Sequence, residues 1–217
     1  MRLNGGMKML LTSDGITSDA IRQKLLDLVG SEPSVHTIAF IPTARNYEGA
    51  NREKVDRTLD TLNSMGFSVK LIDIEKDANW EEQISGCTVI FVGGGNTYYL
   101  MDQINKSGFG ASLPKLLEGR VYVGDSAGSI VVTPSTDIAA VDDGDENIVQ
   151  LSDTSGLGLV DFEVSPHTPE DVSISGNEEY AKTISHKLIA YDNGSAVVVD
   201  GDEVEVIGGE WVEFNGD

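Results

Sequence analysis

Short apolar segments alternate with helical patterns along the first part of the chain, and this alternation constrains the fold more than any other feature. The apolar segments end in Gly, Pro, Ser or Asp, which is typical of buried strands. The expected strands lie at 9–11, 37–41, 69–74, 88–92 and 121–123. The helical patterns between them lie at 18–29, 51–65, 98–104 and 111–117. Because strands that alternate with helices form a parallel sheet covered on both faces, the sequence predicts an α/β fold, a three-layer α/β/α sandwich.

The end of the chain has a different pattern. Four short apolar segments follow one another with Asp-Asn-Gly, Asp-Gly-Asp and Gly-Gly between them, which are typical hairpin turns. They lie at 188–191, 196–199, 204–207 and 211–214. We therefore expect a small antiparallel C-terminal extension of the parallel sheet. A chain of 217 residues with no internal repeat or linker suits one unit, so residues 1–217 are predicted to form a single domain.

The charge excludes two classes of partner. The chain has 36 acidic residues against 15 Lys and Arg, for a net charge of −21. Such a surface repels nucleic acid and anionic membranes, so neither is expected as a partner. The acidic residues are interpreted as a solvated surface that serves solubility, and adaptation to salt is a second hypothesis.

Cysteine content and hydropathy bear on the compartment. Cys87 is the single cysteine, so no disulfide can form within the chain, and it is expected to be a buried structural thiol. No stretch approaches the ~20 apolar residues of a membrane span. The first residues lack the long apolar segment of a signal peptide. We expect a cytoplasmic protein, as a monomer or a homodimer.

The string Gly124-Asp-Ser-Ala-Gly128 is the first motif with a chemical meaning. It follows an expected strand and precedes a probable helix start, which is the context of a nucleophile elbow. Small neighbours are needed there, because the nucleophile stands on a sharp turn at the carboxyl end of the sheet. Ser126 is therefore the candidate nucleophile, although a Gly-flanked serine at a helix start can also be a simple cap.

A second motif, Gly93-Gly-Gly-Asn-Thr97, ends the strand at 88–92. Three glycines let backbone amides approach a ligand closely, and in a hydrolase such a loop supplies an oxyanion-hole amide. A plain strand-to-helix turn capped by Asn96 or Thr97 is the alternative. A dinucleotide loop is disfavoured, because the spacing of its glycines is not matched.

Three histidines are available as a general base. His36 directly precedes an expected strand, and His186 ends a polar helical segment and is expected to be exposed. His167 lies on a loop, in Ser165-Pro-His-Thr-Pro169, where catalytic residues are often found. Together with Ser126 it is the natural general base. Because no metal-binding spacing of Cys, His or Asp occurs, neither a metal nor another cofactor is expected.

These strings together resemble peptidase family S51, which contains dipeptidase E (aspartyl dipeptidase) and cyanophycinase. The resemblance extends from Met7 to about Asp192 and depends on 92–97, 124–128 and Pro166-His167, in that order and at family-like spacing. It implies a fold like that of class I glutamine amidotransferases, with a flavodoxin-like sheet. It also implies that Ser126 is the nucleophile, that His167 is the base, and that Gly95 and Ala127 form the oxyanion hole.

The resemblance further implies an acidic third member of the triad. In aspartyl dipeptidases an aspartate follows a proline that Pro134 matches, and the next segment is about three residues shorter in this chain. Asp137 is the best match, Asp142 and Asp143 are rivals, and cyanophycinases use a glutamate somewhat further along. The family's substrate-clamping arginine after the histidine has no counterpart, because this sequence has no arginine beyond Arg120.

The predicted function is that of a serine peptidase that hydrolyses small peptides through a Ser126-His167-Asp137 triad and an acyl-enzyme. An α/β-hydrolase esterase has the same order of Ser, Asp and His, but the short gap between Ser126 and His167 disfavours it. A catalytically silent binding module on the same scaffold is the other alternative. Because no arginine follows Arg120 and the net charge of −21 disfavours an anionic substrate, we predict no strong preference for aspartate at P1; Arg45 is the one candidate clamp from the first half of the chain.

Overall fold

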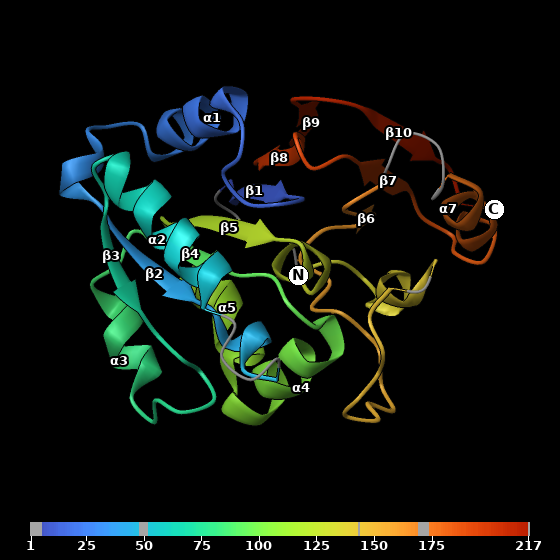
Figure 1. Ribbon diagram of the computed structural model, residues 1–217, viewed down its shortest axis with the longest axis horizontal. Helices are drawn as coiled ribbons and strands as arrows, with labels where there is room; N and C mark the ends of the chain where they lie inside the picture. The colour runs from blue at the N-terminus through green and yellow to red at the C-terminus, as the bar shows by residue number, and fades with distance from the viewer. Residues whose placement is uncertain (1–5, 48–51, 143, 169–173, 217) are drawn as a thin grey trace.

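The computed structural model describes residues 6–47, 52–142, 144–168 and 174–216. Its main sheet has seven strands in the order β3-β2-β4-β5-β1-β8-β9 (Figure 1). The first five of that order are parallel, whereas β8 and β9 add to the sheet as antiparallel strands. The parallel strands are β1 (Lys8–Thr12), β2 (Thr37–Ile41), β3 (Ser68–Leu71), β4 (Val89–Val92) and β5 (Val121–Asp125). All five predicted strands are present, and β3 ends three residues earlier than predicted.

Helices cover both faces of this sheet, which gives the predicted three layers. Apolar side chains of α1 (Asp19–Val29) and α2 (Glu53–Ser64) form one core with Leu10 of β1, on one face of the sheet. On the other face, Met9 and Leu11 of β1 form a second core with side chains of α3 to α6. The bounds of these are α3 (Trp80–Ser85), α4 (Thr97–Ser107), α5 (Phe109–Leu116) and α6 (Ala127–Ile130). Alternate side chains of one strand therefore pack into two separate cores, as expected for a sheet buried on both sides.

The C-terminal part forms a second, three-stranded sheet in the order β10-β7-β6, which lies beside α7 (Figure 1). In it β7 pairs antiparallel with β10 and parallel with β6. The bounds are β6 (Glu163–Ser165), α7 (Ile174–Ala181), β7 (Leu188–Tyr191), β8 (Ala196–Asp200), β9 (Glu203–Ile207) and β10 (Trp211–Phe214). The small antiparallel extension is thus confirmed, but it is divided between two sheets.

Of the three predicted hairpin turns in this region, one joins two paired strands and the other two connect the two sheets. Asp-Gly-Asp joins β8 to β9, which pair with each other as a hairpin. Asp-Asn-Gly instead carries the chain from β7 in the small sheet to β8 in the main sheet, and Gly-Gly carries it back to β10. The chain crosses between sheets at residues 192–195, and this crossing lies close to the carboxyl end of β1, since β8 pairs with β1 from Thr12↔Ala196 onward.

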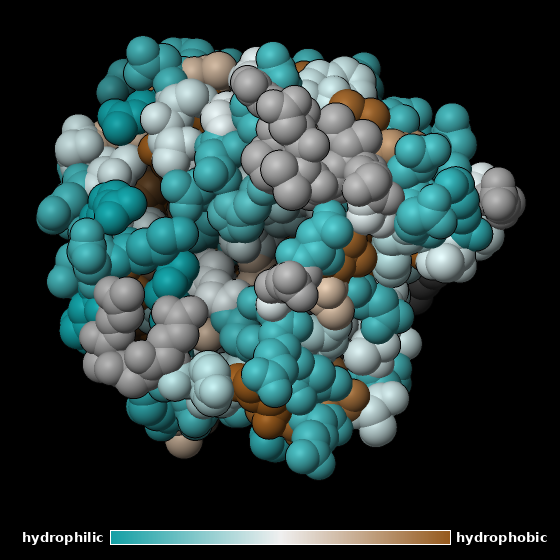
Figure 2. Space-filling model, turned by 45° about the vertical axis from the view of Figure 1, so that its right-hand side comes forward, coloured by the Kyte–Doolittle hydropathy of each residue, from teal (hydrophilic) through white to brown (hydrophobic). Residues whose placement is uncertain are grey.

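The structure also has three short 3₁₀ helices among its described residues. The first, η1 (Pro33–Val35), precedes β2, and the other two follow strands. These are η2 (Thr43–Arg45), after β2, and η3 (Asp137–Ala140), in the long segment after β5. The face of the molecule in Figure 2 is mainly hydrophilic, with small separate hydrophobic areas, in keeping with the high charge. Within the described ranges, no helix is long and apolar enough to span a bilayer. Cys87 is buried, as predicted.

Candidate active site

The turn that carries Ser126 is strained. β5 ends at Asp125 and α6 begins at Ala127, so a single residue reverses the direction of the chain. Ser126 has φ 51° and ψ −110°, outside the regions that residues with a side chain normally occupy. Such a conformation costs on the order of 1–3 kcal/mol and persists where the surrounding structure holds it.

Three hydrogen bonds hold this turn to the core. The amide of Ser126 donates to the carbonyl of Thr12 at 3.0 Å, and the hydroxyl of Ser129 donates to the same carbonyl at 2.8 Å. From the strand below, the hydroxyl of Tyr122 donates to the carbonyl of Gly128 at 2.6 Å. Tyr122 and Ser129 are fully buried, so these bonds are shielded from water and fix the turn relative to β1.

The two glycines of the motif are required by close packing. A Cβ on Gly124 would lie 2.7 Å from the backbone of Gly128, and one on Gly128 would collide with the carbonyl oxygen of Val92 in β4. Both positions therefore exclude any side chain. This explains, in physical terms, why small residues stand on each side of the nucleophile.

His167 meets Ser126 from the other side of the site. Its Nε2 lies 2.9 Å from Oγ of Ser126, so the structure brings together the two residues that the sequence predicted as nucleophile and base. His167 follows β6, with φ 60°, and its amide donates to Oγ of Ser13 at 2.7 Å. The next residue, Thr168, donates its amide to the carbonyl of Tyr191 at 3.2 Å. The imidazole is thus held by residues after β1, β6 and β7.

The second nitrogen of His167 faces an amide, not a carboxylate. Its Nδ1 lies 2.5 Å from Oδ1 of Asn193, in the turn between β7 and β8. Sequence reasoning interpreted Asp-Asn-Gly purely as a turn and missed this residue. No local motif marks Asn193, because its place beside His167 results from the crossing of the chain between the two sheets.

Asp137 does not occupy the place that the resemblance implied. It opens η3 as an exposed residue, and no hydrogen bond joins it to His167. Burial is the main cause of the raised pKa values of Tyr98 and Tyr180, and the negative charge of Asp137 adds to both. Asp142 lies against Gly176 of α7, and Asp143 falls outside the described residues.

The two predicted oxyanion-hole amides belong to residues beside Ser126. Ala127 is its neighbour in sequence, and the loop of Gly94 and Gly95 approaches it in space, since a Cβ on Gly94 would lie 3.1 Å from the Cβ of Ser126. Gly95 has φ 144°, and a Cβ there would lie 2.6 Å from the carbonyl of Ala44. Among the described residues, the amides of Gly95 and Ala127 donate no hydrogen bond.

The same glycine loop also has a structural role. The side chain of Asn96 accepts a hydrogen bond from the amide of Tyr99 at 2.8 Å and so caps α4. Its amide group donates to the carbonyl of Glu146 at 2.9 Å, and the carboxylate of Asp145 accepts from the amide of Thr97 at 2.6 Å. Part of the acidic segment thus fixes the start of α4.

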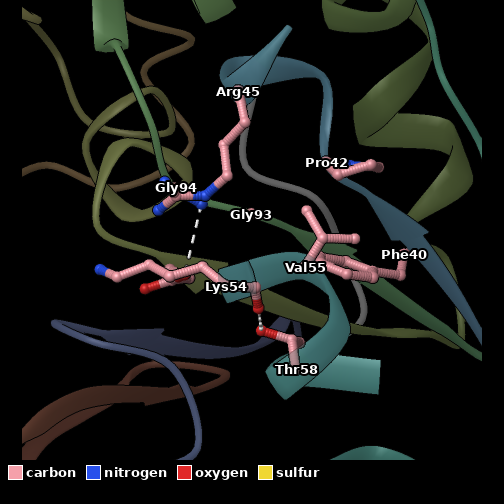
Figure 3. A pocket seen from close by; sticks show the side chains of 9 residues that line it. Phe40, Pro42, Arg45, Lys54, Val55, Thr58, Gly93 and Gly94 are labelled. Atoms are coloured by element: carbon pink, nitrogen blue, oxygen red, sulfur yellow. Dashed lines mark hydrogen bonds between the residues drawn. The ribbon is translucent and has the colours of Figure 1, made fainter. Parts of the chain in front are cut away.

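A small pocket lies beside the nucleophile turn (Figure 3). The side chain of Arg45 from η2 extends toward Gly94 (Figure 3), and Lys54 from α2 and Asp125 also line the pocket. Lys54 is paired with Asp14 at 2.9 Å. The remaining lining residues are Phe40, Pro42, Val55 and Thr58.

The Asp125 carboxyl is the most unusual group of this pocket. It is 8% exposed, its Oδ1 has no hydrogen-bond partner, and its Oδ2 accepts a long bond of 3.3 Å from the amide of Gly94. Burial raises the pKa of Asp125; Lys54, the Gly94 amide and Arg45 oppose this, while Asp14 reinforces it. Burial disfavours the charged form, and the net direction is upward.

The other features predicted from sequence are placed as follows. His186 is half-buried, because its Nε2 lies 2.6 Å from Oε1 of the fully buried Glu163; the expectation of an exposed residue was wrong. His36 bonds to Ser31 and Thr88, away from the site. Among the residues that the structure describes, no three His, Cys, Asp or Glu side chains lie close enough together to hold a metal ion.

Fold and site together define a class of protein. A strained serine at the carboxyl edge of a mostly parallel sheet, hydrogen-bonded to a histidine, is the arrangement of a serine hydrolase. The family model of peptidase family S51 matches residues 9–207. The chain therefore belongs to peptidase family S51 and is a serine-type peptidase.

Relatives agree with this assignment. The chain is 29% identical to an uncharacterized peptidase of Listeria monocytogenes over 77% of this chain and 84% of that protein. It is 29% identical to a probable alpha-aspartyl dipeptidase of Drosophila melanogaster over 86% of this chain and 78% of that protein. A solved structure of a putative peptidase E from Listeria monocytogenes has the same fold, with a TM-score of 0.78 and 24% identity over 95% of this chain and 100% of that one.

Proposed function

We propose that the protein hydrolyses short peptides with Ser126 as nucleophile and His167 as general base. The observation that carries this proposal is the 2.9 Å hydrogen bond between Nε2 of His167 and Oγ of Ser126, on a strained turn that presents this oxygen. A nucleophile and its base within hydrogen-bond reach are what covalent catalysis at a carbonyl requires.

The steps follow from the positions of the groups. His167 takes the proton of Ser126 as the oxygen attacks the carbonyl carbon of the peptide. The amides of Gly95 and Ala127 stabilise the negative charge that develops on the carbonyl oxygen. His167 then donates its proton to the leaving amine, and a water molecule, activated by the same imidazole, releases the acyl group from Ser126. Asp137 has no part in these steps, because it makes no hydrogen bond to His167.

Specificity is proposed to differ from that of an aspartate-selective dipeptidase. The pocket beside Ser126 contains Arg45 and Lys54, but Lys54 is paired with Asp14 and the wall contains Asp125. The net charge of −21 also disfavours an anionic substrate at long range. We expect kcat/KM for Asp-Leu to exceed that for Asn-Leu or Ala-Leu by less than about a hundredfold, or ~2.7 kcal/mol. A larger preference would point to Arg45 as the clamp, to be tested with Arg45→Ala.

Two measurements test the function itself. Incubation with a dipeptide library, followed by detection of the free amino acids, should show release that is absent in Ser126→Ala. A fluorophosphonate probe should label the wild type at Ser126 and leave the variant unlabelled. Hydrolysis of esters without hydrolysis of any peptide would favour the esterase alternative, and the lack of both labelling and hydrolysis would favour a silent binding module.

A further inference from the structure

We propose that Asn193 is the positioning residue of His167, so that the protein uses a Ser-His-Asn arrangement in which a neutral amide replaces the acidic third member. This inference deepens the proposed function, because it rests on His167 as the base. It is carried by the 2.5 Å contact between Nδ1 of His167 and Oδ1 of Asn193. An acceptor at Nδ1 keeps the proton on that nitrogen and leaves Nε2 free to accept the proton of Ser126.

An asparagine can do this only if its oxygen faces the imidazole. In a serine protease, an asparagine in place of the triad aspartate favours the wrong histidine tautomer and costs about ten-thousandfold in kcat. The reason is that the NH₂ of an amide is a donor and would require an unprotonated Nδ1. A Ser-His-Asn site therefore needs a further group that distinguishes the two ends of the amide.

Ser13 is that group. Its Oγ accepts a hydrogen bond from the amide of His167 at 2.7 Å and lies 3.1 Å from Oδ1 of Asn193. With a lone pair used by the backbone amide, the hydroxyl has its one proton to donate, and Oδ1 of Asn193 is the acceptor within reach. Ser13 is fully buried, so water does not compete for this proton. The oxygen of Asn193 is thus turned toward both Ser13 and His167.

The turn that carries Asn193 is held on both sides. Within it, the carboxylate of Asp192 accepts from the amide of Gly194 at 3.0 Å and from the hydroxyl of Ser195 at 2.6 Å. From the loop before α1, Thr17 donates to the carbonyl of Asn193 at 2.9 Å, and Ser18 donates to that of Gly194 at 3.2 Å. Asn193 is exposed as a residue, but its backbone is fixed by these bonds, as a positioning role requires.

A neutral partner has a measurable consequence. The imidazolium formed during catalysis is stabilised less by an amide than by a carboxylate. Asn193→Asp should therefore keep or increase kcat at pH 8 and should move the acidic limb of the kcat/KM profile upward by about one pH unit. Asn193→Ala should lower kcat at least tenfold with KM changed less than about threefold, because it removes the orientation of His167 and not a contact with substrate.

The decisive experiment is a double-mutant cycle between positions 13 and 193. Ser13→Ala should lower kcat about tenfold when residue 193 is Asn, since the amide can then rotate. In the Asn193→Asp background, Ser13→Ala should lower kcat less than about threefold, because a carboxylate has two equivalent oxygens. Support of the His167 backbone by Ser13 is common to both backgrounds and cancels. Equal losses in the two backgrounds would overturn the proposal.

Two further readouts do not depend on finding a peptide substrate. The rate of fluorophosphonate labelling of Ser126 should fall more on Ser13→Ala when residue 193 is Asn than when it is Asp, as expected for kcat. In ¹⁵N-labelled protein, the neutral form of His167 should carry its proton on Nδ1, and Asn193→Ala should lose this signature; with three histidines in the chain, His167→Gln identifies the signals. Asn79→Asp, an exposed helix cap with the same change of charge, is the matched control and should leave all readouts unchanged.

The outcomes separate this inference from the proposed function. Labelling at Ser126 without peptide hydrolysis would contradict the peptide substrate and still test Asn193 through labelling rate and tautomer. A proton on Nε2 of neutral His167 in the wild type would overturn the role of Asn193. So would an Asn193→Ala variant that keeps more than a third of the wild-type kcat or labelling rate.

Discussion

The two halves of the site differ in how they are built. The nucleophile half comes from one stretch of chain, from β5 through Ser126 to α6, and is buried among the strands of the main sheet. The base half combines Ser13, His167 and Asn193, which are more than 150 residues apart at the extremes and come from three connections near the edge of the small sheet. One half is therefore specified by a local motif and the other by topology.

This difference determines what each half tolerates. In the nucleophile half, glycines are fixed by contacts with backbone, and no side chain can move to make room. In the base half, the contacts are hydrogen bonds between side chains and turns, and only Ser13 among its three residues is fully buried. We therefore expect substitutions in the nucleophile half to be severe and those in the base half to be graded.

Removal of the nucleophile should have the largest effect. Ser126→Ala deletes one oxygen at a half-buried position, so the fold should remain, while kcat should fall on the order of a million-fold, as is typical when a catalytic nucleophile is lost. Steady-state hydrolysis, with circular dichroism to confirm folding, checks this. Retention of a tenth of the activity would mean that Ser126 is not the nucleophile.

A methyl group at Gly95 should have the next largest effect. Gly95→Ala would place a Cβ 2.6 Å from the carbonyl of Ala44 at a φ of 144°, so the loop must shift and its amide must leave its position. Loss of one oxyanion donor costs about a hundred- to a thousandfold in kcat. Gly86→Ala is the matched control, because a Cβ there meets no atom within 4 Å. If both variants were equally active, Gly95 would have no place in the oxyanion hole.

The turn of the base half should be sensitive to acid. Burial alone would raise the pKa of Asp192, but hydrogen bonds from Ser195 and from the amides of Glu210 and Gly194 outweigh it and lower the pKa. Since the folded-state pKa is the lower one, the stabilisation is fully present above the ordinary carboxyl value of ~3.9 and is lost as the pH falls through the folded-state pKa.

Asp192→Asn should accordingly lower the free energy of unfolding at pH 7 by about 1 kcal/mol, with a smaller difference from wild type below pH ~4. Urea unfolding at pH 7 and pH 3 measures both values. Asp202→Asn, at an exposed turn position, should change neither. A difference between Asp192→Asn and wild type that grew as the pH fell would contradict the direction of this shift.

The smallest effect is expected at Asp137. Because its carboxylate makes no hydrogen bond to His167, Asp137→Asn should change kcat less than about twofold. A member of the triad would instead cost about ten-thousandfold. A loss of that size would show that the base half rearranges in the working enzyme, and it would restore the aspartate that the resemblance implied.

The same division explains what could be predicted from the sequence. The five parallel strands, the two glycine motifs and the pair of Ser126 and His167 were predicted, because short-range patterns and a strand-turn-helix context encode them. Asn193 was missed because its role depends on a connection between two sheets, and Asp-Asn-Gly has the same pattern as a hairpin turn. β6 was missed because its apolar periodicity is weak, and the polar helical segment expected to end at His186 is α7, which ends at Ala181.

The position of β1 between β5 and β8 has a consequence for the order of events during biosynthesis. A chain is made from its N-terminus at ~5–20 residues per second, and domains fold largely as they emerge. Asn193 is added 67 residues after Ser126, when the parallel strands and the turn of Ser126 have already been made. For several seconds the growing chain holds a nucleophile whose base has no fixed partner. With Asn193 in its proposed role, His167 becomes an oriented base only after the turn between β7 and β8 has been made.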